Sequence, residues 1–185
     1  MDKLSVSVRK PRALRALFSG VALVGAMLAA PGLAHAGSGS RLALDLDYAN
    51  SIKETGFEGG KGLAARYGYK LDLLVLSVTP EVGAGAYWFG GAADARLLTG
   101  FVGGRAAFGK VVEPGVFAHI GYGSMKSGNF DAVGGTTLDA GLSLDFTMVP
   151  LLDFGLHGAY GAAFLKDADE AFDWFRVGAH AALAF

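Results

Sequence analysis

Apolar side chains recur at every second position through most of this 185-residue chain, and this alternation limits the folds that it can adopt. The clearest run is LDAGLSLDF at 138–146, with leucine, alanine and phenylalanine on one face and aspartate, glycine and serine on the other. A period of two residues is typical of a β-strand with two unlike faces, because successive side chains point to opposite sides of the sheet. The pattern therefore predicts an all-β chain.

Eight segments of this kind follow one another to the C-terminus. They are predicted at 42–50, 61–71, 76–88, 96–108, 115–124, 136–148, 152–163 and 174–185. Most have the length of about nine to eleven residues that a tilted strand needs to cross a bilayer. Strands of globular proteins are centred on about five or six residues. Eight long strands in one short chain indicate a single β-barrel.

Residues 1–36 have the features of a cleavable secretory signal peptide. Five basic residues lie before residue 16, an apolar run follows at 17–30, and Pro31-Gly32 ends that run. Ala34 and Ala36 form an A-x-A cleavage site. An uncleaved anchor helix is the alternative, and the short apolar run and the Pro-Gly break disfavour it. We expect a signal peptide over 1–36 and an exported β-barrel over 37–185.

Alternation alone fits both a soluble lipocalin-like barrel, apolar inside, and a membrane barrel, apolar outside. Charged residues make up only 18% of the chain, whereas a soluble exterior carries charge at about a quarter to a third of its positions. Aromatic residues of the apolar face concentrate near strand ends, as in the aromatic girdles of membrane barrels. These features predict an eight-stranded antiparallel up-and-down transmembrane β-barrel.

The other face is rich in glycine and alanine, and charged residues occur singly within it. Such a face suits the narrow interior of an eight-stranded barrel, filled by small residues and a few paired charges. We therefore predict a polar network that faces the lumen. Its predicted members are Asp45, Asp47, Arg66, Lys70, Glu81, Arg105, His119, Asp139, Asp145, His157, Arg176 and His180.

The leader, the eight alternating segments and the C-terminal stretch WFRVGAHAALAF together resemble the small outer-membrane β-barrels of Gram-negative envelopes. The resemblance covers residues 41–185 and is to the OmpA-transmembrane or OmpX type, with OmpW-like barrels more distant. It implies residence in the outer membrane and contact with outer-membrane lipid. It also implies that the export and barrel-assembly machinery recognises the last strand, with Leu183 and Phe185 as alternate apolar positions of the signal.

Three histidines follow the predicted cleavage site. In the alternation of their strands, all three have the parity of the polar face, that is, they fall at its every-second positions. His157 and His180 lie on neighbouring predicted strands, but the spacing supplies no further metal ligand at matching depth. Hydrogen-bonded lumen histidines without a metal or cofactor are therefore expected. A lipid-facing hydrolase of the kind found among small outer-membrane barrels would need His, Ser and an acid on the outer face. The inward parity of the histidines favours a chain without catalytic residues.

The net charge and the character of the loops reduce the number of possible functions. The formal net charge is −1, which gives no basis for nucleic-acid binding, because that activity requires clustered Lys and Arg. The expected role is non-enzymatic, namely structural, adhesive or a narrow, porin-like pathway in the cell envelope. Two alternatives stay open: OmpW-like transport of small hydrophobic molecules, which the short polar loops disfavour, and a lipid-modifying outer-membrane enzyme.

Overall fold

The computed structural model describes residues 39–52, 57–91, 94–128, 130–166 and 168–185. The predicted signal peptide, with Ala34 and Ala36, lies outside the described residues. Eight strands occupy most of the described chain: Gly39–Ser51 (β1), Glu58–Leu73 (β2), Leu76–Gly90 (β3), Ala95–Phe108 (β4), Val112–Ser127 (β5), Val133–Val149 (β6), Leu152–Leu165 (β7) and Phe172–Ala184 (β8). Within this part of the chain, no helix has the length and apolar composition needed to cross a bilayer.

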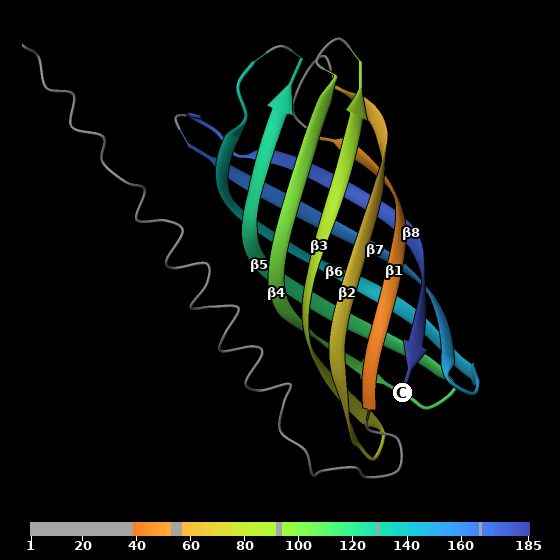
Figure 1. The fold of residues 1–185 in the computed structure, drawn as a ribbon. Coiled ribbons are helices and arrows are strands. Elements are labelled where there is room, and N and C mark those ends of the chain that lie inside the picture. The colour runs from red at the N-terminus through yellow and green to blue at the C-terminus, as the bar shows by residue number, and fades with distance from the viewer. Residues whose placement is uncertain (1–38, 53–56, 92–93, 129, 167) are drawn as a thin grey trace, which may run out of the picture. The chain divides into compact units, whose positions relative to one another are not determined.

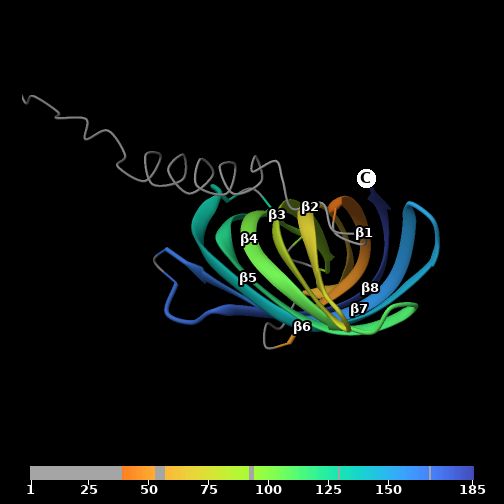
Figure 2. The ribbon, with the colours of Figure 1, turned by 90° about the horizontal axis from the view of Figure 1, so that it is seen from below.

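Each strand pairs antiparallel with the next, and β1 pairs with β8 to close the barrel (Figure 1). Seen from below, after a turn of 90° about the horizontal axis, the strands run obliquely around a ring (Figure 2). The predicted fold class and strand order are therefore confirmed. The observed strands run past most predicted ends. For example, β6 begins at Val133 instead of 136, because Gly134 and Gly135 pair with β5 although they carry no apolar signal.

The two ends of the barrel differ in their connections. Three tight turns join β2 to β3, β4 to β5 and β6 to β7, at the end where β1 begins and β8 finishes (Figure 1). Gly109 in the second turn has a φ of +124°, and a Cβ there would lie 2.3 Å from the carbonyl oxygen of Val112. Only glycine fits this turn. We call this the terminal end and the opposite end the loop end.

The exterior of the barrel is apolar. Leu46 and Leu142 near the middle of their strands are 68% and 67% exposed, which a soluble fold does not offer in a continuous band. Exposed aromatic rings include Tyr48, Tyr122 and Phe175 towards the loop end, and Phe108, Phe154 and Phe185 towards the terminal end. An apolar band between two sets of aromatic rings is the surface of a membrane-spanning barrel. The chain is thus an integral membrane protein of the outer-membrane β-barrel type.

Candidate functional site

The lumen is filled by charged side chains that bind one another, and Arg66 is the most extensively paired. Its Nε and Nη2 donate to the two carboxylate oxygens of Asp45, at 2.7 and 2.9 Å, and its Nη1 donates to Oε1 of Glu81 at 2.8 Å. All three residues are at most 7% exposed. The guanidinium of β2 thus joins the strands on either side, β1 and β3, with the two-pronged geometry that arginine offers to a carboxylate.

Arg105 and Arg176 carry the network across the barrel. Nη1 of Arg105 on β4 donates to both oxygens of Asp145 on β6, at 3.2 and 3.0 Å. Arg176 on β8 donates to the hydroxyl of Tyr87 at 3.1 Å and to Oδ1 of Asp139 at 3.2 Å. These bonds connect strands that are not neighbours in the sheet, so they cross the space that a channel would occupy.

His119 on β5 lies between two carboxylates. Its Nδ1 is 2.8 Å from Asp139, and its Nε2 is 3.2 Å from Glu81. A carboxylate only accepts hydrogen bonds, so both ring nitrogens must donate, and the ring is an imidazolium in this arrangement. Phe101 and Phe117 flank the ring, with centroids 4.7 and 5.3 Å from its own.

The structure brings eleven of the twelve predicted lumen residues into one connected set of hydrogen bonds and ion pairs. This set, here called the lumen network, consists of Asp45, Asp47, Arg66, Glu81, Arg105, His119, Asp139, Asp145, His157, Arg176 and His180. The twelfth, Lys70, lies outside it and binds Glu113 on β5 at 2.7 Å. Leu183 and Phe185 face outwards, 54% and 71% exposed.

The terminal end of the lumen holds charged residues that the sequence prediction omitted. Arg41 pairs with Asp153, and Glu113 accepts from Lys70. They border an open basin of about 810 Å³ at this end of the barrel. Asp153 shares the parity of His157, and Glu113 that of His119, so alternation was the available signal. Glu113 was missed because the fifth strand was predicted to begin at 115, whereas β5 begins at Val112.

The loop end of the lumen is apolar instead of charged. The mouth cluster consists of Ala49, Tyr87, Phe89, Ala95, Leu97, Met125, Ala163, Phe172 and Trp174. Phe89 and Leu97 are 1% and 0% exposed, and the rings of Phe89 and Phe172 meet edge to face at 5.2 Å. These residues fall at inward positions of the alternation, but the sequence prediction expected only small and charged side chains in the lumen and no large apolar ones. The cluster fills the barrel above the lumen network.

The fold is similar to those of several solved outer-membrane proteins. No family model and no curated protein sequence matches the chain. Among solved structures, Neisserial surface protein A has a TM-score of 0.65 at 14% identity, covering 80% of this chain and 99% of that one. Ail, the attachment invasion locus protein of Yersinia pestis, has a TM-score of 0.52 at 18% identity, with the same coverage. The outer membrane enzyme PagL has a TM-score of 0.52 at 12% identity, covering 77% of this chain and 99% of that one.

At these identities the likeness is one of fold. The predicted resemblance to eight-stranded outer-membrane barrels is confirmed by the closed eight-stranded topology and by these matches. Together with the apolar exterior, it assigns the chain to the outer membrane. One relative is an enzyme and another an attachment protein by name, so the fold does not fix the activity.

Proposed function

We propose that this chain is a non-enzymatic outer-membrane barrel with a structural or adhesive role and a lumen closed to solutes. The observation that supports this most directly is the filling of the lumen. Charges that would line a water-filled channel are instead bonded to one another across it, and Phe89 and Leu97 close the loop end. Ail is an attachment protein by name, which is why adhesion is included in the proposal.

A lipid-modifying activity is less well supported by the positions of the histidines. His119, His157 and His180 are 5%, 8% and 7% exposed, and all point into the lumen. A hydrolase acting on membrane lipid needs its histidine at the outer surface, within reach of the scissile bond. Transport of small hydrophobic molecules requires an open apolar passage, whereas the mouth cluster is packed ring against ring.

Planar-bilayer recordings test the closed lumen. We expect the purified barrel to show no stable ion conductance, because the cavities beside Arg66 measure about 20 and 10 Å³, each about the volume that one water requires. A porin inserted in the same bilayer serves as the positive control. Steady channels that also pass sugars would contradict the proposal.

We further propose that the barrel-assembly machinery reads Leu183 and Phe185 at the end of β8. Phe185 also exchanges two backbone hydrogen bonds with Ser40, at 2.8 and 2.9 Å, so deleting it would remove closing bonds as well as the ring. The substitution Phe185→Ala keeps the backbone and removes only the side chain.

We expect both deletion of Phe185 and Phe185→Ala to lower the heat-modifiable, assembled form several-fold in cells, without changing export. Gel mobility with and without heating measures assembly, and the size of the processed chain measures export. Phe154→Ala is the matched control, since Phe154 is also an exposed aromatic residue at the terminal end. Normal assembly of Phe185→Ala would show that the ring is not read.

A further inference from the structure

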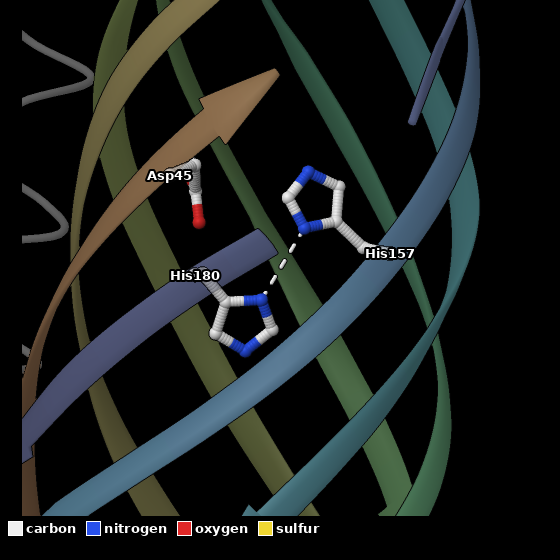
Figure 3. Close-up of side chains that lie close together, drawn as sticks. All are labelled: Asp45, His157 and His180. Atoms are coloured by element: carbon white, nitrogen blue, oxygen red, sulfur yellow. Dashed lines mark hydrogen bonds between the residues drawn. The ribbon is translucent and has the colours of Figure 1, made fainter. Parts of the chain in front are cut away.

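Asp45, His157 and His180 meet inside the barrel, on three strands that are consecutive around the ring, β1, β8 and β7 (Figure 3). One ligand atom from each lies within 4.8 Å of the others. The register explains the meeting, because Asp45 is directly opposite His180 in the β1–β8 pair. All three side chains are at most 8% exposed, and the two imidazoles face each other with their Nδ1 atoms 3.2 Å apart.

Glycines make this close approach possible. Gly155 is opposite His180 in the β7–β8 pair, and a Cβ there would lie 2.4 Å from Cε1 of His180. Gly178 is opposite His157, and a Cβ there would lie 2.2 Å from Oδ1 of Asp47 and 3.0 Å from Nε2 of His157. Each imidazole therefore lies over a glycine of the neighbouring strand.

The far side of each imidazole is held by a carboxylate. Nε2 of His157 is 2.6 Å from Oδ1 of Asp47, and Nε2 of His180 is 2.8 Å from Oδ1 of Asp145. Because a carboxylate only accepts, both Nε2 atoms donate, and in the neutral rings both Nδ1 atoms carry lone pairs. Two lone pairs facing each other at 3.2 Å repel unless a cation lies between them. Histidines that bind metals are oriented in this way, with the second nitrogen on a carboxylate.

We propose that Nδ1 of His157, Nδ1 of His180 and a carboxylate oxygen of Asp45 bind one divalent transition-metal ion, such as Zn²⁺. Zinc binds imidazole nitrogen at about 2.0–2.1 Å in tetrahedral geometry, which separates two ligand nitrogens by roughly 3.3–3.4 Å. The observed 3.2 Å between the two nitrogens requires only a small outward shift of the rings, whereas the three ligand atoms together, which lie within 4.8 Å of one another, would have to draw closer around the ion. Arg66 fixes the Asp45 carboxylate in place and leaves each oxygen a second lone pair for the metal.

The charges of the lumen network nearly balance one another before an ion is added. The network contains five carboxylates and three guanidiniums, and the imidazolium of His119 supplies a fourth positive charge. The sum is then −1, and a divalent ion would change it to +1, so the charge balance by itself neither favours nor opposes the ion. A cavity of about 20 Å³ lined by His180 and Arg66 lies next to the site, and Arg41 lines both this cavity and the basin at the terminal end. An ion that enters from the terminal end would have to pass the side chain of Arg41, which is paired with Asp153.

The test is a titration of the refolded full-length mature barrel with Zn²⁺ and Co²⁺ after treatment with a chelator. We expect one equivalent to bind, and Zn²⁺ at 100 times its Kd to reduce the unfolding equilibrium constant about 100-fold. His157→Gln and His180→Gln are expected to weaken binding at least 100-fold. His119→Gln is the control for loss of a lumen histidine that is not a proposed ligand, because both nitrogens of His119 are occupied by carboxylates, and the variant should still bind one equivalent no more weakly than the wild type.

X-ray absorption of the zinc-loaded wild type keeps the test decisive if the glutamine variants fail to refold. Two imidazole ligands and one carboxylate oxygen are expected, and a shell of oxygen ligands alone would overturn the proposal. The proposal would also be overturned if Zn²⁺ left the wild-type unfolding transition unchanged. The gap between the two rings would then hold a shared proton instead of a metal ion. Retention of full affinity by His180→Gln would overturn it as well. None of these results bears on conductance, so the closed lumen is tested separately.

Discussion

Replacing Arg66 with methionine is expected to lower the free energy of unfolding by about 3–5 kcal/mol, the range for removing one partner of a buried ion pair. The substitution keeps an apolar side chain in the space and removes three hydrogen bonds, leaving Asp45 without its bidentate partner. Asp45 is 1% exposed, so water does not replace the lost guanidinium. Urea unfolding in liposomes measures the change.

Two further variants separate the loss of a buried pair from the loss of a positive charge. Lys126→Met removes an exposed cation from the same barrel and is expected to change the free energy of unfolding by at most about 0.5 kcal/mol. The double variant Arg66→Met, Asp45→Asn should recover part of the loss, because it removes the carboxylate charge that Arg66→Met leaves without its bidentate partner. Equal losses in Arg66→Met and Lys126→Met would show that the lumen network contributes nothing specific.

Leu142→Arg is expected to cost about 2–4 kcal/mol of unfolding free energy, the scale for a basic side chain at the bilayer midplane of a barrel. Leu142 lies in the middle of β6 and is 67% exposed, so the new charge would enter hydrocarbon. Met148→Arg is the matched control. Met148 is 70% exposed but lies near the terminal end of the same strand, where the expected cost is about 0–1 kcal/mol.

The comparison of the two sites tests the direction of the faces as well as their depth. A lipid-phase quencher should reach a fluorescent label at 142 and not one at 143, because Ser143 is 7% exposed and points inward. Equal costs for Leu142→Arg and Met148→Arg, with quenching at 143 only, would show that the barrel has the opposite orientation of its faces.

The fold was predictable because the inside and the outside of a membrane barrel differ at every step along a strand. Leu142 and Ser143 are adjacent in sequence and face different surroundings, so alternation alone identifies both the strand and the direction of its side chains. The same information is lost where both faces carry small residues. At Gly134 and Gly135 no contrast exists, and the backbone pairing that continues there leaves no trace in the sequence.

The lumen network was predictable in membership but not in pairing. Parity places Arg66, Asp45 and Glu81 on one face, yet which carboxylate meets which guanidinium depends on the stagger of neighbouring strands. In the structure Arg66 is opposite Ala43 and Gly83, and it reaches its two partners diagonally. The sequence does not specify that stagger. For the same reason the sequence does not show that Asp45 meets the two histidines of β7 and β8.

Aromatic residues of the lumen were missed for a different reason. Phe117 has the parity of His119, and the guanidiniums of Arg105 and Arg176 lie 5.3 and 5.7 Å from its ring centre. An apolar ring among charges contradicts the simple rule of a polar interior. It is stable because an aromatic face attracts a cation. Trp174 of the mouth cluster was likewise assigned no inward role.

Pairing between β1 and β8 also has a consequence for the order of folding. Asp47 of β1 binds His157 and Arg176, which lie 110 and 129 residues away along the chain. Contacts between such distant residues form slowly, because the chain must first bring its two ends together. Until then Asp45 and Asp47 lie on an open sheet edge, and exposing them to hydrocarbon is costly. The charges that stabilise the finished barrel therefore oppose insertion of an unclosed one, so closure and insertion should proceed as a single kinetic step.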